Sequence, residues 1–576
     1  MTKTVTKTGA TDWTSLPHMM LDLARGWHAR PMLRHWEGGA RDGAWHAITW
    51  GEYAHRVAAM AAFLRARGVA PGDRILLVSE NRPEFPIADT AAMAIGAVTV
   101  PTYVTNTVAD HAHILRDSGA TVAIVSTHRL AERMAEAAAQ AGRTLDLTIC
   151  MEPGAPGALD WSAAIATPAD PAMLLAEAEL IPPGRLACLV YTSGTGGLPK
   201  GVMLPHRAML ANREGVARIA TRLHLDGTPY LSFLPLSHSY EHTVGGFLLP
   251  SLGLEVVYSR GADRLAAELK EIQPTVITAV PRLFEVLRGR IEAQVEKDGG
   301  LKQKLFRQAL ALGLRKMDGP PLSLFEKVQD AVLDRLVRAK VRERFGGKLL
   351  ALVSGGARLD PDLSGFFLAM GLPVIQGYGQ TEAGPVISVN PPWANRRSTV
   401  GPPLPGVEAR IAEDGELCVR GDLVMDGYWN DPDSTSRALV DGWLHTGDVG
   451  EITDGYIRIT DRKRDFIKTL GGDMVSPAKL ESLLMAEPEI TQAVVAGEGR
   501  PAIVALVVPA DGMADKVQAA IARVNGRLSN IERIRASTVV EPFTVENGLL
   551  TPTMKVKRRL VLERHAAAVE GLAKRG

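Results

Sequence analysis

The sequence predicts an α/β protein with a large, multi-layer N-terminal unit of mainly parallel sheets and a small α+β C-terminal unit joined by a hinge. Its 576 residues are too many for a single hydrophobic core, since single cores stop growing near roughly 250–300 residues. In the first part, apolar strand-like segments alternate with helical spacing, which is typical of parallel sheets covered on both faces. From residue 466 onward, two strand-like segments lie among helical ones, which indicates the second unit.

The individual elements follow from the spacing of apolar residues. Residues 57–64 repeat at helical spacing, and Gly68 can end that helix. A second helix is expected over 108–117. Strands are expected at 74–79, 120–126, 186–191, 275–280 and 349–354, and a strand pair at 490–496 and 502–508. The charged run 461–465 marks the boundary, so 1–460 would form the N-terminal unit, 461–465 the hinge and 466–576 a mobile C-terminal unit.

Residues 301–345 predict charged helices with one apolar face. We expect this face to pack on the rest of the domain, and a helix lying on a membrane surface is the alternative. The face consists of Phe325, Val328, Val332, Leu333 and Leu336.

The composition excludes several classes of protein. Lys and Arg number 65 and Asp and Glu number 64, a balance that gives no reason to expect a nucleic-acid partner. Three widely spaced cysteines, at 150, 188 and 418, predict neither a disulfide framework nor a zinc site. The start lacks a secretory signal, and the longest uncharged stretch, 90–109, contains a proline and an asparagine. We expect a cytoplasmic protein without a transmembrane span, and peripheral membrane contact stays open.

A glycine-rich loop gives the strongest local signal. The segment YTSGTGGLPKG, residues 191–201, follows an apolar strand. Glycines allow backbone amides to approach anionic oxygens, hydroxyls add donors, and Lys200 adds positive charge. This chemistry suits a triphosphate, although the spacing differs from a Walker A loop.

The loop resembles the phosphate-binding signature YTSGTTGxPKG of the adenylate-forming superfamily, which includes acyl-CoA synthetases, luciferases and adenylation domains. Gly196 replaces the second threonine of that signature. The resemblance runs from about residue 20 to 565 and implies ATP as a cosubstrate. Its phosphates would be bound by Thr192, Ser193, Gly194, Thr195, Gly197 and Lys200.

Two later segments, VSGGAR at 353–358 and QGYGQTE at 376–382, resemble further family signatures. Tyr378 can stack on a purine, and Glu382 is a hard oxygen ligand suited to Mg²⁺. The resemblance places Thr381 at the α-phosphate. It assigns adenine and ribose to Gly355, Gly356, Ala357, Gln376, Gly377, Tyr378, Gly379, Asp448 and Arg462.

The C-terminal part carries the remaining signatures. Asp461 and Arg464 fall on the hinge of the family, although Arg464 stands where Lys or Asp is common, and Gly471 and Gly472 match the loop that lines its CoA tunnel. Lys555 matches the catalytic lysine, which acts with Lys200 and Thr381, although Met554 stands where many members have glycine. These matches imply CoA as a second cosubstrate and a rotation of the C-terminal unit between two half-reactions.

The segment LPLSHSYEH, residues 234–242, resembles the acyl-pocket sequence of long-chain fatty acyl-CoA synthetases. His238 would lie between nucleotide and acyl chain, and His242 replaces the arginine of the usual gate. The resemblance therefore implies that medium- or long-chain fatty acid, ATP and CoA give acyl-CoA, AMP and diphosphate. The alternatives are another carboxylate–CoA ligase, such as an aryl one, an acyl-AMP ligase that loads a carrier protein, and a non-catalytic lipid- or nucleotide-binding homologue.

Overall fold

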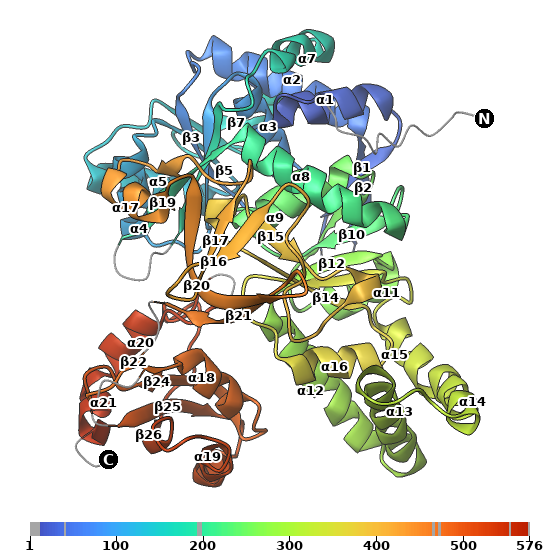
Figure 1. The fold of residues 1–576 in the computed structure, drawn as a ribbon. Coiled ribbons are helices and arrows are strands. Elements are labelled where there is room, and N and C mark those ends of the chain that lie inside the picture. Colours follow the sequence, from blue (N-terminus) through green and yellow to red (C-terminus); the bar gives the residue numbers. More distant parts are fainter. Residues whose placement is uncertain are drawn as a thin grey trace.

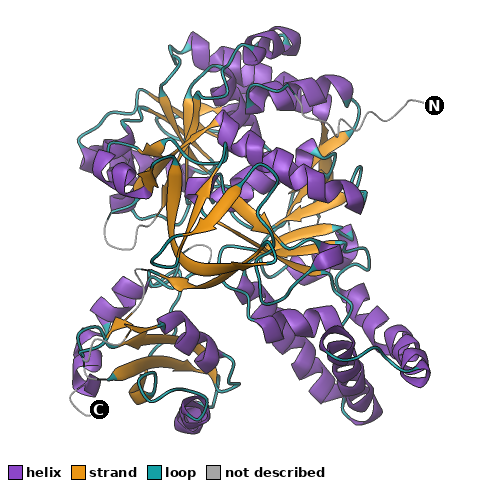
Figure 2. Cartoon of the chain, in the orientation of Figure 1, coloured by secondary structure: helices purple, strands orange, loops and turns teal. Residues whose placement is uncertain are grey.

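The computed structural model describes residues 12–39, 42–192, 198–463, 467–470, 474–500, 502–551 and 554–573. Figure 1 shows a large unit that contains three sheets and, below it, a small body formed by the C-terminal residues. Helices cover the sheets of both parts (Figure 2). This is the mixed α/β architecture that the sequence predicts.

The first sheet has eight strands in the order β18-β9-β8-β4-β3-β5-β6-β7. Strands β3 to β8 pair in parallel, whereas β9 is antiparallel to both of its neighbours. Three of the predicted strands are here, because buried apolar runs are what a sheet covered on both faces requires. The strands are β3 (Arg74–Val78), β4 (Val98–Thr102), β5 (Val122–Val125), β6 (Leu147–Cys150), β7 (Leu159–Asp160), β8 (Leu186–Thr192), β9 (Lys200–Pro205) and β18 (Gly427–Tyr428).

The second sheet also has eight strands, in the order β15-β14-β13-β12-β10-β11-β1-β2. Its central strands are parallel and include both strands predicted between 275 and 354. The strands are β1 (Pro31–Glu37), β2 (Ala44–Thr49), β10 (Pro229–Ser232), β11 (Glu255–Tyr258), β12 (Val276–Ala279), β13 (Ala351–Ser354), β14 (Val374–Gly379) and β15 (Val386–Val389).

A third sheet, of five strands, was not among the expectations, because most of its strands are short or only partly buried and do not form long apolar runs. All of its pairs are antiparallel. The strands are β16 (Glu408–Ile411), β17 (Glu416–Arg420), β19 (Leu439–Val440), β20 (Trp443–Thr453) and β21 (Tyr456–Arg462).

Helices fill the spaces between the sheets and over them. The expected helices are α2, which begins with a capping box at Thr49 and ends before Gly68, and α4. The α-helices of the large unit are α1 (Leu16–Gly26), α2 (Trp50–Ala66), α3 (Glu84–Ala94), α4 (Val108–Ser118), α5 (His128–Ala141), α6 (Trp161–Ile165), α7 (Pro171–Glu179), α8 (His206–Ala220), α9 (Ser239–Thr243), α10 (Leu249–Ser251), α11 (Leu265–Ile272), α12 (Pro281–Asp298), α13 (Gly300–Asp318), α14 (Leu324–Leu333), α15 (Ala339–Arg344), α16 (Pro361–Ala369) and α17 (Pro432–Ala438).

The small C-terminal body has a three-stranded sheet, β24-β25-β26, and its own apolar clusters. The predicted strand pair is confirmed as the antiparallel pair β24–β25, and β26 adds a parallel edge. Asp461 lies near the end of β21, and Arg464 lies outside the described residues. The hinge at 461–465 therefore stays a prediction. The elements are β22 (Ile467–Lys468), β23 (Met474–Val475), β24 (Ile490–Ala496), β25 (Ile503–Pro509), β26 (Ile534–Val539), α18 (Pro477–Met485), α19 (Val517–Asn525), α20 (Arg558–Arg564) and α21 (Ala566–Ala573).

The segment 301–345 is helical as predicted, but its apolar face is mostly exposed and not packed on the domain as expected. Leu333 is buried, whereas the other four residues of that face are exposed. The helix α14 is held through its opposite side, where Asp330 accepts hydrogen bonds from Lys316 and Arg338. The expectation that this face packs on the domain was therefore wrong.

Among the described residues, none of the helices is both long and apolar enough to traverse a bilayer.

Candidate functional site

A cavity of about 1670 Å³ lies where the two eight-stranded sheets, the five-stranded sheet and the C-terminal body meet. The carboxyl ends of β8, β12, β13 and β14 open onto it, which is the edge where parallel sheets bind ligands. From the C-terminal body, α18 and residues 554–558 complete the wall. The cavity therefore gathers most of the motifs that the sequence singled out.

The glycine-rich loop is described only at its ends. Thr192, the last residue of β8, and Lys200, the first of β9, both line the cavity. Ser193, Gly194, Thr195 and Gly197, together with Gly196, lie outside the described residues. Their predicted contacts with phosphate stay predictions.

Lys200 is held by a partner that the sequence did not reveal. Its Nζ lies 2.8 Å from Asp431 Oδ2 and also donates to the Ser434 hydroxyl. The ring centroid of Tyr428 lies 5.5 Å from the same ammonium. The hydrogen bond from Lys200 is the main reason that the pKa of Asp431 falls to about 2. In the sequence, an aspartate before Pro432 indicates only the start of a helix. Asp431 is indeed the N-cap of α17, in addition to its contact with Lys200.

The glycines after β13 and in β14 bring the backbone close to the cavity. Gly355, Gly356 and Ala357 line it, as do Gly377 and Gly379. A Cβ at Gly355 would lie 2.9 Å from the Tyr240 ring, so a larger residue would collide with it. Of the predicted adenine set, Gln376 does not line the cavity, although its neighbours Ile375 and Gly377 do.

Tyr378, Asp448 and Arg462 form one hydrogen-bonded group that joins β14, β20 and β21. The Tyr378 hydroxyl donates to Asp448 Oδ2 over 2.6 Å, and Arg462 Nε lies 3.0 Å from Asp448 Oδ1. Burial, followed by the charge of Asp448, raises the pKa of Tyr378. Asp448 itself is buried behind Tyr378 and Arg462, which line the cavity. Three residues predicted from separate motifs thus meet.

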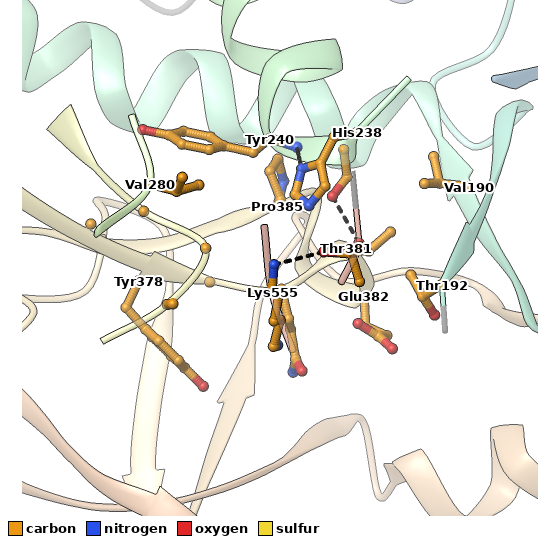
Figure 3. Close-up of a pocket in the computed structure, with 18 of the residues that line it drawn as sticks. Val190, Thr192, His238, Tyr240, Val280, Tyr378, Thr381, Glu382, Pro385 and Lys555 are labelled. Carbon is orange, nitrogen blue, oxygen red and sulfur yellow. Dashed lines mark hydrogen bonds between the residues drawn. The ribbon is translucent and has the colours of Figure 1, made fainter. Parts of the chain in front are cut away.

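Lys555 reaches from the C-terminal body into the large unit. Figure 3 shows its side chain pointing toward Thr381 and His238. His238 caps α9, and its Nδ1 accepts from Tyr240 N over 3.1 Å. Burial and then the positive charge of Lys555 lower the pKa of His238 to about 4, so its ring is neutral at pH 7. Beside it, the Ser239 and Thr381 hydroxyls are 2.8 Å apart.

Glu382 follows Thr381 and presents a carboxylate to the cavity. The Tyr428 hydroxyl donates to Glu382 Oε1 over 2.9 Å, which leaves Oε2 for other partners. Within the described part of the chain, no group of three or more His, Cys, Asp or Glu residues could hold a metal alone. A single carboxylate nevertheless fits Mg²⁺, which keeps water ligands and usually binds through one or two carboxylates together with substrate phosphates.

His242 does not lie where the gate prediction put it. It is buried, with Nε2 2.9 Å from Asp89 Oδ2 and its ring edge-on to Phe85 and Phe247. The cavity wall contains His238 but not His242. His238 is the N-cap of α9 and has extended backbone, so its side chain leaves the chain outside the helix, whereas His242 lies within the helix and packs toward α3. Asp461 likewise is buried off the cavity, and Gly471 and Gly472 lie outside the described residues.

Glu241, between these histidines, is a fully buried acid surrounded by hydroxyls. Tyr230 donates to both of its oxygens, at 2.6 and 2.7 Å, and Ser232 and Thr278 donate one bond each. Burial outweighs these donors and raises the pKa of Glu241 from 4.5 to about 7. The folded chain therefore holds this proton more tightly than the unfolded chain does.

The Glu241 proton predicts a pH-dependent loss of stability. A raised acid pKa contributes stability that is complete below pH 4.5 and is lost as pH rises through about 7. Relative to Glu241→Gln, which cannot ionise, the wild type should lose up to about 3 kcal/mol between pH 4.5 and 8.5. Unfolding followed by circular dichroism across this range measures the difference. A constant offset between the two proteins would contradict the assignment.

Comparison with known proteins identifies the family. A profile described as "AMP-binding enzyme" matches residues 6–429, and one described as "AMP-binding enzyme C-terminal domain" matches residues 464–575. The chain belongs to the AMP-binding enzymes.

Relatives in this family are similar along most of the chain. The long-chain-fatty-acid–CoA ligase FadD15 of Mycobacterium tuberculosis is 35% identical, over 92% of this chain and 93% of its own. The peroxisomal long chain acyl-CoA synthetase 6 of Arabidopsis thaliana is 29% identical, over 93% of this chain and 83% of its own. Among solved structures, ATP-bound MatB from Rhodopseudomonas palustris has a TM-score of 0.73 at 22% identity, covering 96% of this chain and 99% of its own.

Membership of the AMP-binding enzymes agrees with the arrangement of the cavity, in which five of the family-like motifs contribute to one wall. The structure also adds residues that sequence reasoning missed, namely Tyr428, Asp431 and Ser434 around Lys200. They lie more than two hundred residues beyond it. No local pattern could pair them, since the contact depends on the antiparallel pairing of β18 with β9.

Proposed function

We propose that this AMP-binding enzyme is an AMP-forming acid–CoA ligase for medium- to long-chain fatty acids. It converts fatty acid, ATP and CoA into acyl-CoA, AMP and diphosphate through an acyl-adenylate. One observation carries the proposal: a single cavity joins a polar region around Lys200, Glu382 and Lys555 to an extended apolar region. The names of the two relatives, both ligases of long-chain acids, support it.

The first half-reaction joins two anions. A carboxylate oxygen attacks the α-phosphorus of ATP, the bond to the bridging oxygen of diphosphate breaks, and a mixed anhydride forms. Neutralising charge and aligning the reactants are therefore the main requirements. Lys555 would lie between the carboxylate and the α-phosphate, with Thr381 beside it. Lys200 would leave its ion pair with Asp431 and bind the outer phosphates of ATP instead. Glu382 would hold Mg²⁺, which supplies further charge neutralisation when bound.

The nucleoside would occupy the cleft beside Tyr378. Its aromatic face offers a surface for adenine, and Gly355, Gly356 and Ala357 line the same cavity. Asp448 has acceptor capacity for about four hydrogen bonds. Tyr378 and Arg462 occupy two of these positions, which leaves capacity for ribose hydroxyls.

The second half-reaction breaks the anhydride. The CoA sulfur attacks the acyl carbon, a thioester forms and AMP leaves with the electron pair. Lys555 occupies that side of the site, so it must withdraw. We propose that residues 466–576 rotate about 461–465 and present Gly471 and Gly472 to the pantetheine arm. Between the two bodies, the hydrogen bond from Arg282 to the Thr491 carbonyl, 3.3 Å long, is a contact that such a rotation would break.

The apolar region follows the strands away from the polar centre. Along β13 and the residue after it, the wall residues Ala351, Val353 and Gly355 alternate with residues that are not on the wall, and Ile375 continues the same layer on β14. Four residues of strand span about 13 Å. Helix α8 faces this layer with Val216, Ile219 and Ala220. This slot suits a flexible alkyl chain better than a compact ring.

Ala351, at the far end of this layer, tests the slot. Ala351→Phe should lower kcat/KM for long-chain acids by roughly tenfold or more, because about 1–3 kcal/mol of transition-state binding depends on each methylene-sized change in an apolar pocket. Short-chain acids end before this position, so their rates should change little. Diphosphate release over acids of increasing length measures both, and the short acids act as the internal control. An equal loss of kcat/KM for acids of every chain length would contradict the assignment of this slot to the alkyl chain.

The same assay with and without CoA separates the competing functions. Diphosphate release that depends on a fatty acid, followed by consumption of CoA, supports the proposal. Release without consumption of CoA would indicate an enzyme that loads a carrier protein. Release with aryl acids alone would indicate an aryl–CoA ligase, and no release with any acid would indicate a binding protein.

A further inference from the structure

The outer face of α14 exposes a stripe of large apolar side chains. Leu324 is 82% exposed, Phe325 79% and Val328 66%, and Val332 and Leu336 are half exposed. Their spacing places all five on one side of a continuous helical segment. Thirteen residues thus carry five of the large exposed hydrophobic residues of the described chain. Clusters of this kind mark interaction sites, whereas single exposed residues do not.

The opposite side of α14 and of the turn that follows it is fixed to the large unit, so the stripe faces outward. Leu333 is buried in an apolar cluster to which α12, α13 and α16 contribute. On the same side, the buried Arg338 pairs with Asp330 at 2.6 Å and donates to the Ala309 and Ala369 carbonyls. Figure 1 shows α14 at the outer end of this helical arm, away from the sheets. The stripe is therefore a fixed feature of the surface.

The charge around the stripe indicates the kind of partner. Residues 301–345 contain eleven Lys and Arg but only five Asp and Glu, although the whole chain is nearly neutral. Exposed Lys327 and Arg335 lie three residues after Leu324 and Val332, so they border the stripe or lie within it. An apolar face with an aromatic residue and basic neighbours is the pattern of helices that lie in the interface of an anionic membrane.

We propose that the outer face of α14 docks onto the headgroup region of an anionic phospholipid bilayer. The apolar stripe enters the boundary between headgroups and acyl chains, while the basic side chains contact lipid phosphates. A second copy of this chain is a poorer occupant, because a twofold contact would bring the same basic surfaces together. The proposal concerns the binding of a surface and does not depend on the proposed reaction.

Co-sedimentation of the full chain with vesicles tests this docking. We expect binding to vesicles that contain phosphatidylglycerol, weakening at high salt, and much weaker binding to pure phosphatidylcholine vesicles. Phe325→Glu with Val328→Glu should weaken binding to the anionic vesicles by at least roughly tenfold. The matched control is Met173→Glu with Leu180→Glu, which changes two equally exposed residues near α7 by the same charge and should bind as the wild type does.

Three results would overturn the proposal. The first is that the wild type does not sediment with phosphatidylglycerol vesicles, and the second is that the α14 variant and the α7 control lose binding equally. In the third, sedimentation velocity without lipid would show a dimer that the α14 variant abolishes, which would make the stripe a contact between copies. Circular dichroism melts of both variants establish that each is folded.

Discussion

Replacing Lys555 with alanine should slow acyl-adenylate formation by about 10²–10³, while the step from acyl-adenylate to thioester continues at a near-normal rate. The reason lies in the geometry. Lys555 belongs to the C-terminal body, yet its side chain points at Thr381 and is close enough to His238 to lower the pKa of that ring (Figure 3). In this arrangement the ammonium is ready for the first half-reaction. In the second it would have withdrawn.

Single-turnover measurements separate the two steps. The first uses acid and ATP, and the second uses chemically prepared acyl-adenylate and CoA. Arg559→Ala is the matched control, because Arg559 is an exposed cation four residues further on that pairs with Glu563. It should leave both rates unchanged. If Lys555→Ala slowed both half-reactions equally, the proposed rotation of residues 466–576 would be wrong.

Replacing Asp448 with alanine should weaken AMP binding by roughly 10- to 100-fold or more, since each hydrogen bond to a charged group contributes about 1.5–3 kcal/mol. The substitution removes the predicted acceptor of the ribose hydroxyls. It also leaves the buried Tyr378 hydroxyl and the Arg462 guanidinium without the carboxylate that orients them. Both effects act in the same direction.

Calorimetric titration with AMP measures this loss. Glu451→Ala is the control, because Glu451 is an exposed acid on the same strand and pairs with Arg458. Asp448→Asn divides the effect further, since the amide keeps the shape but can accept at only one atom. Unchanged AMP affinity in Asp448→Ala would remove Asp448 from the nucleotide site.

Much of the fold could be predicted from local pattern. Buried parallel strands such as β3 and β8 are continuous apolar runs, and α2 has a capping box at one end and a glycine at the other. The five-stranded sheet escaped prediction because its strands are short or half exposed. Burial on both faces leaves a clear signal in the sequence, and partial burial leaves a weak one.

The sequence by itself determined several of the chemical groups in the cavity, because the motifs around Lys200, Tyr378 and Lys555 fix residue types at fixed spacing. Only the tertiary structure decided how the groups are paired. Asp431 meets Lys200 through strand pairing across more than two hundred residues, and His242 turns away to Asp89. Likewise, helical spacing defined the apolar face of α14 but not its exposure. Which side of an amphipathic helix becomes buried depends on what packs against it, and here the ion pairs of Asp330 hold the other side inward.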